Sequence, residues 1–189
     1  MKTALVFIAD GSEEIEALTP VDYLRRAGVA VTLLAVGTAT ATVKCSHNVV
    51  VVADMTLKDY LAKGNPLPDA VVVPGGMPGA TNIAASSEAL SLIDAVNDAG
   101  KLVCSICASP AVVLSKTNAL KGRSWTCYPG MEGEASAYRS AYTAAPFTVD
   151  GTLITGRGPG AAEQFSMEIV RALAGEDVYA KVKAGSLQR

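Results

Sequence analysis

The chain has 189 residues, of which 50% are hydrophobic and 18% charged, and its formal net charge is −2. These values are typical of a compact globular protein and predict a single domain over residues 1–189. The near-neutral charge gives no reason to expect nucleic acid or an anionic membrane as a partner. No apolar run reaches the roughly eighteen residues that a membrane span requires, and no secretory signal is recognisable, so we expect a cytoplasmic protein.

Apolar strands and helical patterns alternate along the first half of the chain. Pro20 is expected to kink or interrupt the first helix. The predicted elements are a strand at 3–9, a helix at 13–27, a strand at 30–36, a hairpin from 42–45 and 49–54, a helix at 57–62, and a strand at 70–73 that ends in the glycine loop 74–79.

The second half continues this alternation. It predicts a helix at 87–100, a strand at 102–106, a helix at 110–116, a strand at 123–126, a hairpin from 147–150 and 153–155, a glycine-rich loop at 156–160, and helices at 161–174 and 176–184. Strands that alternate with helices indicate right-handed βαβ units. We therefore predict an α/β fold, a mostly parallel sheet with helices on both faces.

Three breaks of the chain follow predicted strands, at residues 10–12, at Gly75-Gly76 and at Cys107. In a parallel sheet the working site lies at the carboxyl ends of the strands. The fold prediction therefore brings Glu16, the glycine loop and Cys107 towards one place.

Cys107 lies where a buried strand must turn sharply into a helix. The small residues Ser105 and Ser109 on either side give the spacing of a nucleophile elbow. Ser109 is also a suitable helix cap, and Pro110 suits the first helical position. The start of a helix favours the thiolate, so we expect a lowered pKa. The alternative is that Cys107 is a small buried apolar residue. The convergence of the three breaks favours the reactive cysteine.

Two other kinds of cysteine site are less well supported. Cys104 and Cys107 form a C-x-x-C that could be a redox pair, but Cys104 lies inside the apolar strand. Zinc would need more ligands, because there is no second C-x-x-C and His47 is the only histidine. We predict no metal, and we expect Cys45 and Cys127 to be reduced thiols as well.

The glycine loop and Glu16 suggest roles around the thiol. The loop lacks both the G-x-G-x-x-G order and a P-loop lysine, so a nucleotide is not expected. Its better use is an oxyanion site, with the backbone N–H groups of Gly76 and Ala108 as donors. Glu16, if desolvation keeps it protonated, can donate to the thiolate and exchange a proton with substrate. The alternative is a solvated acid in the first turn of the helix.

Five motifs, nearly end to end and in order, resemble the ThiJ/PfpI superfamily. They are most similar to the branch that contains the parkinsonism-associated deglycase. The motifs are residues 9–16 (ADGSEEIE), 21–28 (VDYLRRAG), 73–80 (VPGGMPGA), 105–110 (SICASP) and 156–160 (GRGPG).

This resemblance implies a flavodoxin-like three-layer sandwich, a homodimer and no cofactor. It implies that Cys107 is a reactive, oxidation-sensitive thiol, that Glu16 is its protonated partner and that Gly76 and Ala108 are backbone donors. We place Gly75 and Tyr128 in the lining of the same site. The implied function is a glyoxalase or deglycase that acts on methylglyoxal, a small aldehyde, or on its glycated adducts. The implied alternative is a redox sensor or chaperone that works through oxidation of Cys107.

Three positions depart from the pattern of the superfamily. Protease-like members have a histidine directly after the nucleophile, where this chain has Ala108. Many relatives of the parkinsonism protein have a histidine where this chain has Tyr128, and His47 stands where an arginine is common near the dimer contact. A Cys–His dyad is therefore not expected, and neither is peptide hydrolysis. Proton transfer would depend on Glu16 alone.

Overall fold

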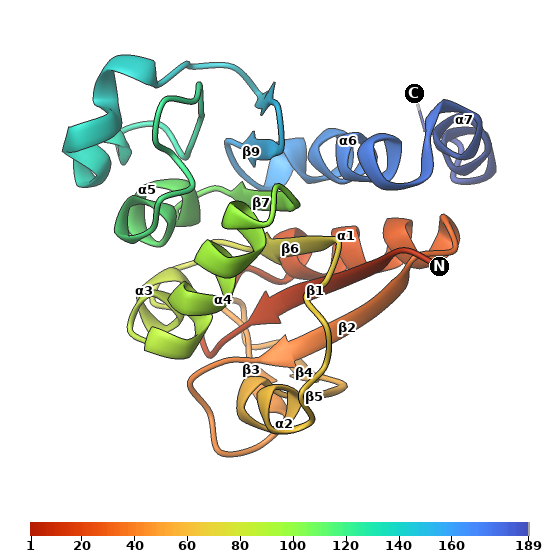
Figure 1. Cartoon of the computed structure of the whole chain (residues 1–189), viewed down its shortest axis with the longest axis horizontal. Helices are drawn as coiled ribbons and strands as arrows, with labels where there is room; N and C mark the ends of the chain where they lie inside the picture. Colours follow the sequence, from red (N-terminus) through yellow and green to blue (C-terminus); the bar gives the residue numbers. More distant parts are fainter. Residues whose placement is uncertain (189) are drawn as a thin grey trace.

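The computed structural model describes residues 1–188 and has a seven-stranded sheet with helices on both faces (Figure 1). The strand order is β5-β2-β1-β6-β7-β9-β8, and only the edge strand β8 runs antiparallel to its neighbour. The strands are β1 (Thr3–Ile8), β2 (Ala30–Ala35), β5 (Met55–Thr56), β6 (Ala70–Val73), β7 (Leu102–Ile106), β8 (Phe147–Asp150) and β9 (Leu153–Gly156). A separate hairpin consists of β3 (Thr42–Lys44) and β4 (Val50–Val52).

The helices form a layer on each side of the sheet. They are α1 (Glu14–Arg26), α2 (Leu57–Ala62), α3 (Gly79–Ala84), α4 (Ser87–Asp98), α5 (Ser109–Val112), α6 (Ala162–Ala174) and α7 (Glu176–Gly185), with 3₁₀ turns at Leu114–Lys116, Glu132–Ala141 and Pro159–Ala161. Helices α1 and α6 pack on one another, and α3 packs against both α4 and α5. Within residues 1–188, no helix is both long enough and apolar enough to cross a membrane.

The core follows from the continuous apolar runs of the central strands. Every residue of β6 and β7 is buried, as is β1 after its first residue. Strands covered on both faces show such runs rather than an alternation of apolar and polar residues. The mostly parallel α/β sandwich predicted from the sequence is therefore confirmed, and so are both predicted hairpins.

The structure differs from the predicted elements at three places, the first being that no interruption occurs at Pro20. Helix α1 continues through Pro20, because packing of its buried face on α6 outweighs the lost backbone hydrogen bond. The predicted strand at 123–126 is reduced to one bridge between Trp125 and Tyr142. Side chains satisfy its backbone instead, since Asp150 accepts from the N–H of Ser124 and Thr155 from that of Thr126. Helix α3 was not predicted at all.

Candidate active site

Cys107 occupies the sharp turn between β7 and α5. Its φ of 64° lies in the left-handed region, which residues other than glycine rarely adopt. The turn is held on both sides, because its N–H donates to the Gly156 carbonyl at 2.8 Å and its own carbonyl accepts from the N–H of Tyr128 at 2.8 Å. The sequence predicted a sharp turn at this residue. The structure adds that the backbone of this residue is strained.

Ser109 does not act as the predicted helix cap. The first helical residue of α5 is Ser109 itself, and Ala108, which precedes it, makes no side-chain cap. The buried hydroxyl of Ser109 instead donates to the Pro74 carbonyl at 2.5 Å. This bond ties the start of α5 to the glycine loop.

Glu16 is fully buried in the first turn of α1, so the solvated alternative is wrong. Its Oε2 accepts from the N–H of Gly75 at 2.9 Å, and its own N–H donates to the Glu13 carboxylate at 2.8 Å. A side-chain hydrogen bond with the Cys107 thiol lowers the pKa of Glu16, and no other side chain pairs with its Oε1 within residues 1–188. Burial dominates and raises that pKa to about 7, and the charge of Glu13 adds to the increase. A buried carboxylate with an unpartnered oxygen is costly, which favours the protonated carboxyl.

Gly75 is the point where the groups around the thiol meet. A Cβ built on this residue would lie 2.7 Å from the Cys107 Cβ, 2.8 Å from Glu16 Oε2 and 2.9 Å from the Ala108 nitrogen. Only glycine lets three groups approach the backbone so closely. The structure therefore brings together Cys107, Glu16, Gly75 and Ala108, four of the residues that the sequence analysis assigned to one site.

The lowered pKa predicted for Cys107 is wrong. Burial, and then the charge of Glu16, raise the pKa of this thiol to about 12, against backbone hydrogen bonds from Gly76 and Ala108. Helix α5 has only four residues, so its dipole is too small to offset burial. Together, Cys107 and Glu16 hold at least one proton at neutral pH, and their titrations are coupled.

The four cysteines differ in access rather than in acidity. Burial raises the pKa of Cys45 to about 11 and that of Cys127 to about 12, and the pKa of Cys104 is raised too. Cys107 is 9% exposed, compared with 4% for Cys45 and 0% for the other two. Cys107 is therefore the thiol that a small molecule reaches most readily.

A cavity of about 390 Å³ is lined by Tyr128, whose backbone N–H donates to the carbonyl of Cys107. Tyr128, which is 48% exposed, forms one wall, and residues 157–161 form the other. The sequence analysis placed Tyr128 in the site but did not include Arg157. The only available signal was the charge of Arg157 within a glycine-rich loop after a strand.

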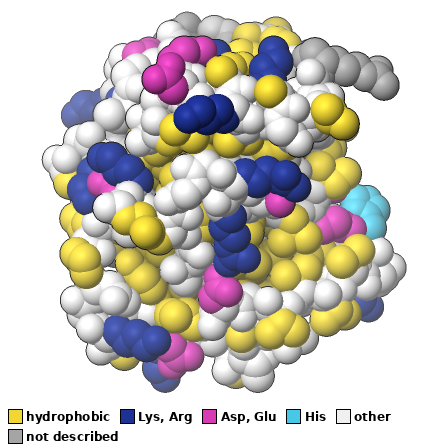
Figure 2. All heavy atoms as spheres, turned by 90° about the vertical axis from the view of Figure 1, so that its right-hand side faces the viewer, with side chains coloured by type: hydrophobic (Ala, Val, Ile, Leu, Met, Phe, Trp, Pro, Cys, Tyr) yellow, Lys and Arg dark blue, Asp and Glu magenta, His cyan; other side chains and the backbone are white. Residues whose placement is uncertain are grey.

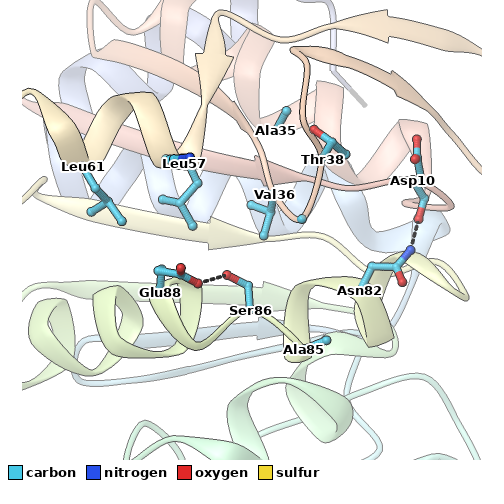
Figure 3. A pocket seen from close by; sticks show the side chains of 12 residues that line it. Asp10, Ala35, Val36, Thr38, Leu57, Leu61, Asn82, Ala85, Ser86 and Glu88 are labelled. Carbon is cyan, nitrogen blue, oxygen red and sulfur yellow. Dashed lines mark hydrogen bonds between the residues drawn. The ribbon is translucent and has the colours of Figure 1, made fainter.

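A second cavity, of about 780 Å³, lies between α2 on one side and α3 and α4 on the other (Figure 3). None of the predicted site residues lines it. Figure 3 shows Leu57 and Leu61 directed into it from α2, opposite Ser86 and Glu88 of the α4 region. Its larger volume therefore comes without the chemistry found around Cys107.

His47 lies apart from the thiol, with its side chain 70% exposed. Its Nδ1 is 3.2 Å from Glu14 Oε1 and 3.9 Å from Glu13 Oε1, and Figure 2 shows this histidine beside acidic side chains. The three residues could in principle hold a metal ion, but Glu13 already caps α1 and Glu14 already accepts from Ser46. Within residues 1–188 there is no hydrogen bond between Cys107 and the histidine.

Residues 2–172 match the DJ-1/PfpI family. The chain is 38% identical over 186 residues to the Parkinson disease protein 7 homolog of Danio rerio, covering 97% of this chain and 95% of the relative. It is 30% identical over 177 residues to the glutathione-independent glyoxalase DJR-1.2 of Caenorhabditis elegans, covering 93% and 91%. The solved structure of oxidized Toxoplasma gondii DJ-1 is similar, with a TM-score of 0.90 at 32% identity over 99% of this chain and 98% of that one.

Proposed function

Since the chain belongs to the DJ-1/PfpI family, we propose that it is a cofactor-independent, cysteine-dependent glyoxalase or deglycase. It acts on methylglyoxal or its adducts and protects the cytoplasm against carbonyl and oxidative stress. The observation that carries this proposal is the fully buried carboxyl of Glu16 next to the thiol of Cys107, the most exposed of the four cysteines. A buried acid with a strongly shifted pKa next to a nucleophile is typical of an active site.

The first step is addition of the thiol to the aldehyde carbon. The bond between sulfur and carbon forms, the proton of the thiol passes to the aldehyde oxygen, and the product is a hemithioacetal. The N–H groups of Gly76 and Ala108, which interact with the sulfur of Cys107, stabilise the negative charge that develops on oxygen. No metal ion or cofactor is needed for this step.

Glu16 then moves a proton between the two carbons of the former dicarbonyl. As a carboxylate it removes the proton from the carbon bound to sulfur, and as a carboxyl it returns that proton to the neighbouring carbon. A pKa of about 7 suits both directions of transfer at neutral pH. The hydroxyl proton on the carbon bound to sulfur passes to the neighbouring oxygen, which gives a thioester. Water then hydrolyses the thioester, which releases a hydroxy acid and restores the thiol.

A methylglyoxal assay without glutathione tests this function. We expect turnover by the wild type, loss of turnover in Cys107→Ser, and a decrease of about 100-fold or more in Glu16→Gln, the usual contribution of a general acid–base group. Cys45→Ser is the matched control and should retain activity, because Cys45 is buried outside the site. Unchanged turnover in Cys107→Ser would contradict the proposal.

One observation favours a second function, as a redox sensor or chaperone. A similar protein, Toxoplasma gondii DJ-1, was solved in an oxidized form. In this chain, two equivalents of peroxide would convert the Cys107 thiol to a sulfinic acid and release two waters. The carboxyl of Glu16 would then donate to a sulfinate oxygen. Oxidation confined to Cys107 by mass spectrometry, in a protein without aldehyde turnover, would favour this function.

We also propose a homodimer that uses the start of α1 and the β3–β4 hairpin. Ile15 is 52% exposed, and Val50 and Val52 are 61% and 72% exposed. The hairpin region adjoins α1, because the hydroxyl of Ser46 donates to Glu14 at 3.1 Å. Sedimentation at micromolar concentration should give the mass of two chains, and the mass of one chain would contradict the dimer.

A further inference from the structure

The cavity of about 390 Å³ lies next to residues that form backbone hydrogen bonds with Cys107. The N–H of Cys107 donates to the carbonyl of Gly156, the residue before Arg157, and its carbonyl accepts from the N–H of Tyr128. Arg157 and Tyr128 are therefore placed relative to the thiol by backbone hydrogen bonds of 2.8 Å. These bonds place the cavity beside the turn that carries the thiol.

The side chains that line the cavity carry only positive charge. Its lining contains one charged side chain, Arg157, which is exposed and has no ion-pair partner in the described part of the chain. The other lining residues are Tyr128, Pro129, Gly158, Pro159, Gly160 and Ala161. A guanidinium without an ion-pair partner favours an anionic ligand.

We propose that this cavity, the Arg157 subsite, receives the carboxylate tail of an α-oxoaldehyde whose aldehyde carbon reacts with Cys107. This inference rests on the proposed function and names the class of substrate. The guanidinium of Arg157 can donate two parallel hydrogen bonds to a carboxylate, and the hydroxyl of Tyr128 supplies a further donor.

The shape of the wall agrees with a ligand of this kind. A Cβ on Gly158 would lie 3.5 Å from Cδ2 of Tyr128, so the aromatic ring packs against the backbone of Gly158, which has no side chain. The larger cavity offers no such preference, because Lys58 lines it together with Asp10 and Glu88 and the charges are mixed. An anionic tail is therefore drawn to the Arg157 subsite rather than to the larger space.

The test compares two α-oxoaldehydes of five carbons, 4,5-dioxopentanoate with its carboxylate and neutral 2-oxopentanal. Because a charge-assisted hydrogen bond is worth a factor of about ten or more, we expect the wild type to prefer the carboxylate about ten-fold in kcat/KM. Arg157→Gln should bring this ratio close to one, and Arg157→Lys should retain part of it. Lys58→Gln, which removes one positive charge from the other cavity, should leave the ratio unchanged.

A second measurement does not depend on turnover. Pentanoate should slow alkylation of Cys107 by iodoacetamide in the wild type, pentanamide should not, and Arg157→Gln should abolish the difference. Equal effects of the two probes, or a preference that survives in Arg157→Gln, would overturn the subsite and leave the proposed function standing. If no α-oxoaldehyde is turned over but pentanoate still protects Cys107 through Arg157, the proposed function fails and the anion site remains.

Discussion

Two of the cavities of the molecule differ in chemistry, and the smaller one lies closer to the strained and buried groups. The cavity between α2 and α4 has a volume of about 780 Å³, compared with about 390 Å³ beside Cys107. In the larger one, the Asn82 side chain donates to the Asp10 carbonyl at 2.8 Å, and the Ser86 hydroxyl donates to Glu88 at 3.1 Å (Figure 3). Its polar groups are exposed to water or already paired.

In the region around Cys107, polar side chains are buried away from water and some of their atoms lack a hydrogen-bond partner. Glu16 is fully buried with an unpartnered oxygen, and Cys107 is held in a left-handed conformation. Unsatisfied buried groups and backbone strain both cost stability, so they persist only where the surrounding structure enforces them. The comparison teaches that the volume of a cavity does not indicate where buried polar groups and backbone strain occur in this fold.

The largest expected difference between the two regions is in the effect of a glycine-to-alanine substitution on stability and turnover. Gly75→Ala would collide with Cys107, Glu16 and Ala108, so we expect a loss of about 3 kcal/mol in stability and of at least about 100-fold in turnover. Gly37→Ala, in the larger cavity, has no contact closer than 3.7 Å and should cost only about 1–2 kcal/mol for its positive φ. Urea unfolding and the methylglyoxal assay measure both effects. Equal activity in the two variants would break the comparison.

The pH dependence of stability should have opposite signs in the two regions. The pKa of Glu16 is raised to about 7, so the stability tied to its protonated form is present below about pH 4.5 and is lost as pH rises through 7. Relative to Glu16→Gln, the wild type should lose up to about 3 kcal/mol over that range. The pKa of Glu88 is lowered by hydrogen bonds from its own N–H and from Ser86 and Ser87, so its smaller contribution is lost as pH falls.

Urea unfolding of the wild type, Glu16→Gln and Glu88→Gln between pH 4 and 8 checks both signs. The control is internal, because each substitution should flatten a different part of the wild-type curve. A wild-type stability that rises relative to Glu16→Gln between pH 4.5 and 7 would show that Glu16 is ionised at low pH, contrary to our interpretation.

The smallest expected effect concerns two helix caps. Glu13 accepts from the N–H of Glu16 at 2.8 Å, and Ser86, which lines the larger cavity, accepts from that of Ala89 at 3.2 Å. Either substitution by alanine should cost about 1 kcal/mol of stability. Only Glu13→Ala should also lower aldehyde turnover, because it releases the backbone that positions Glu16. Matched losses of activity in the two variants would indicate a general effect of stability.

The sequence predicts those parts of the molecule that follow from local patterns. The apolar runs of β1, β6 and β7 predicted the sheet, and small residues on both sides of Cys107 predicted the sharp turn. Helix α3 was missed because it begins at a glycine and has no side-chain cap, so neither usual start signal was present.

Properties that depend on tertiary packing were not predicted correctly. The raised pKa of Cys107 comes from burial and from Glu16, which is 91 positions away in sequence. Together these two effects outweigh the dipole of the short helix α5. The bond from the Ser109 hydroxyl to Pro74 joins two loops whose distance no local pattern reports. The same holds for Arg157, whose relation to the thiol depends on the pairing of β7 with β9.

The left-handed backbone at Cys107 has a consequence for how this sequence can change. Glycine adopts such a φ without the penalty of about 1–2 kcal/mol that a side chain incurs, so Cys107→Gly would be a more relaxed protein at this turn. The side chain at this turn is therefore kept at a cost in backbone free energy that glycine would not have.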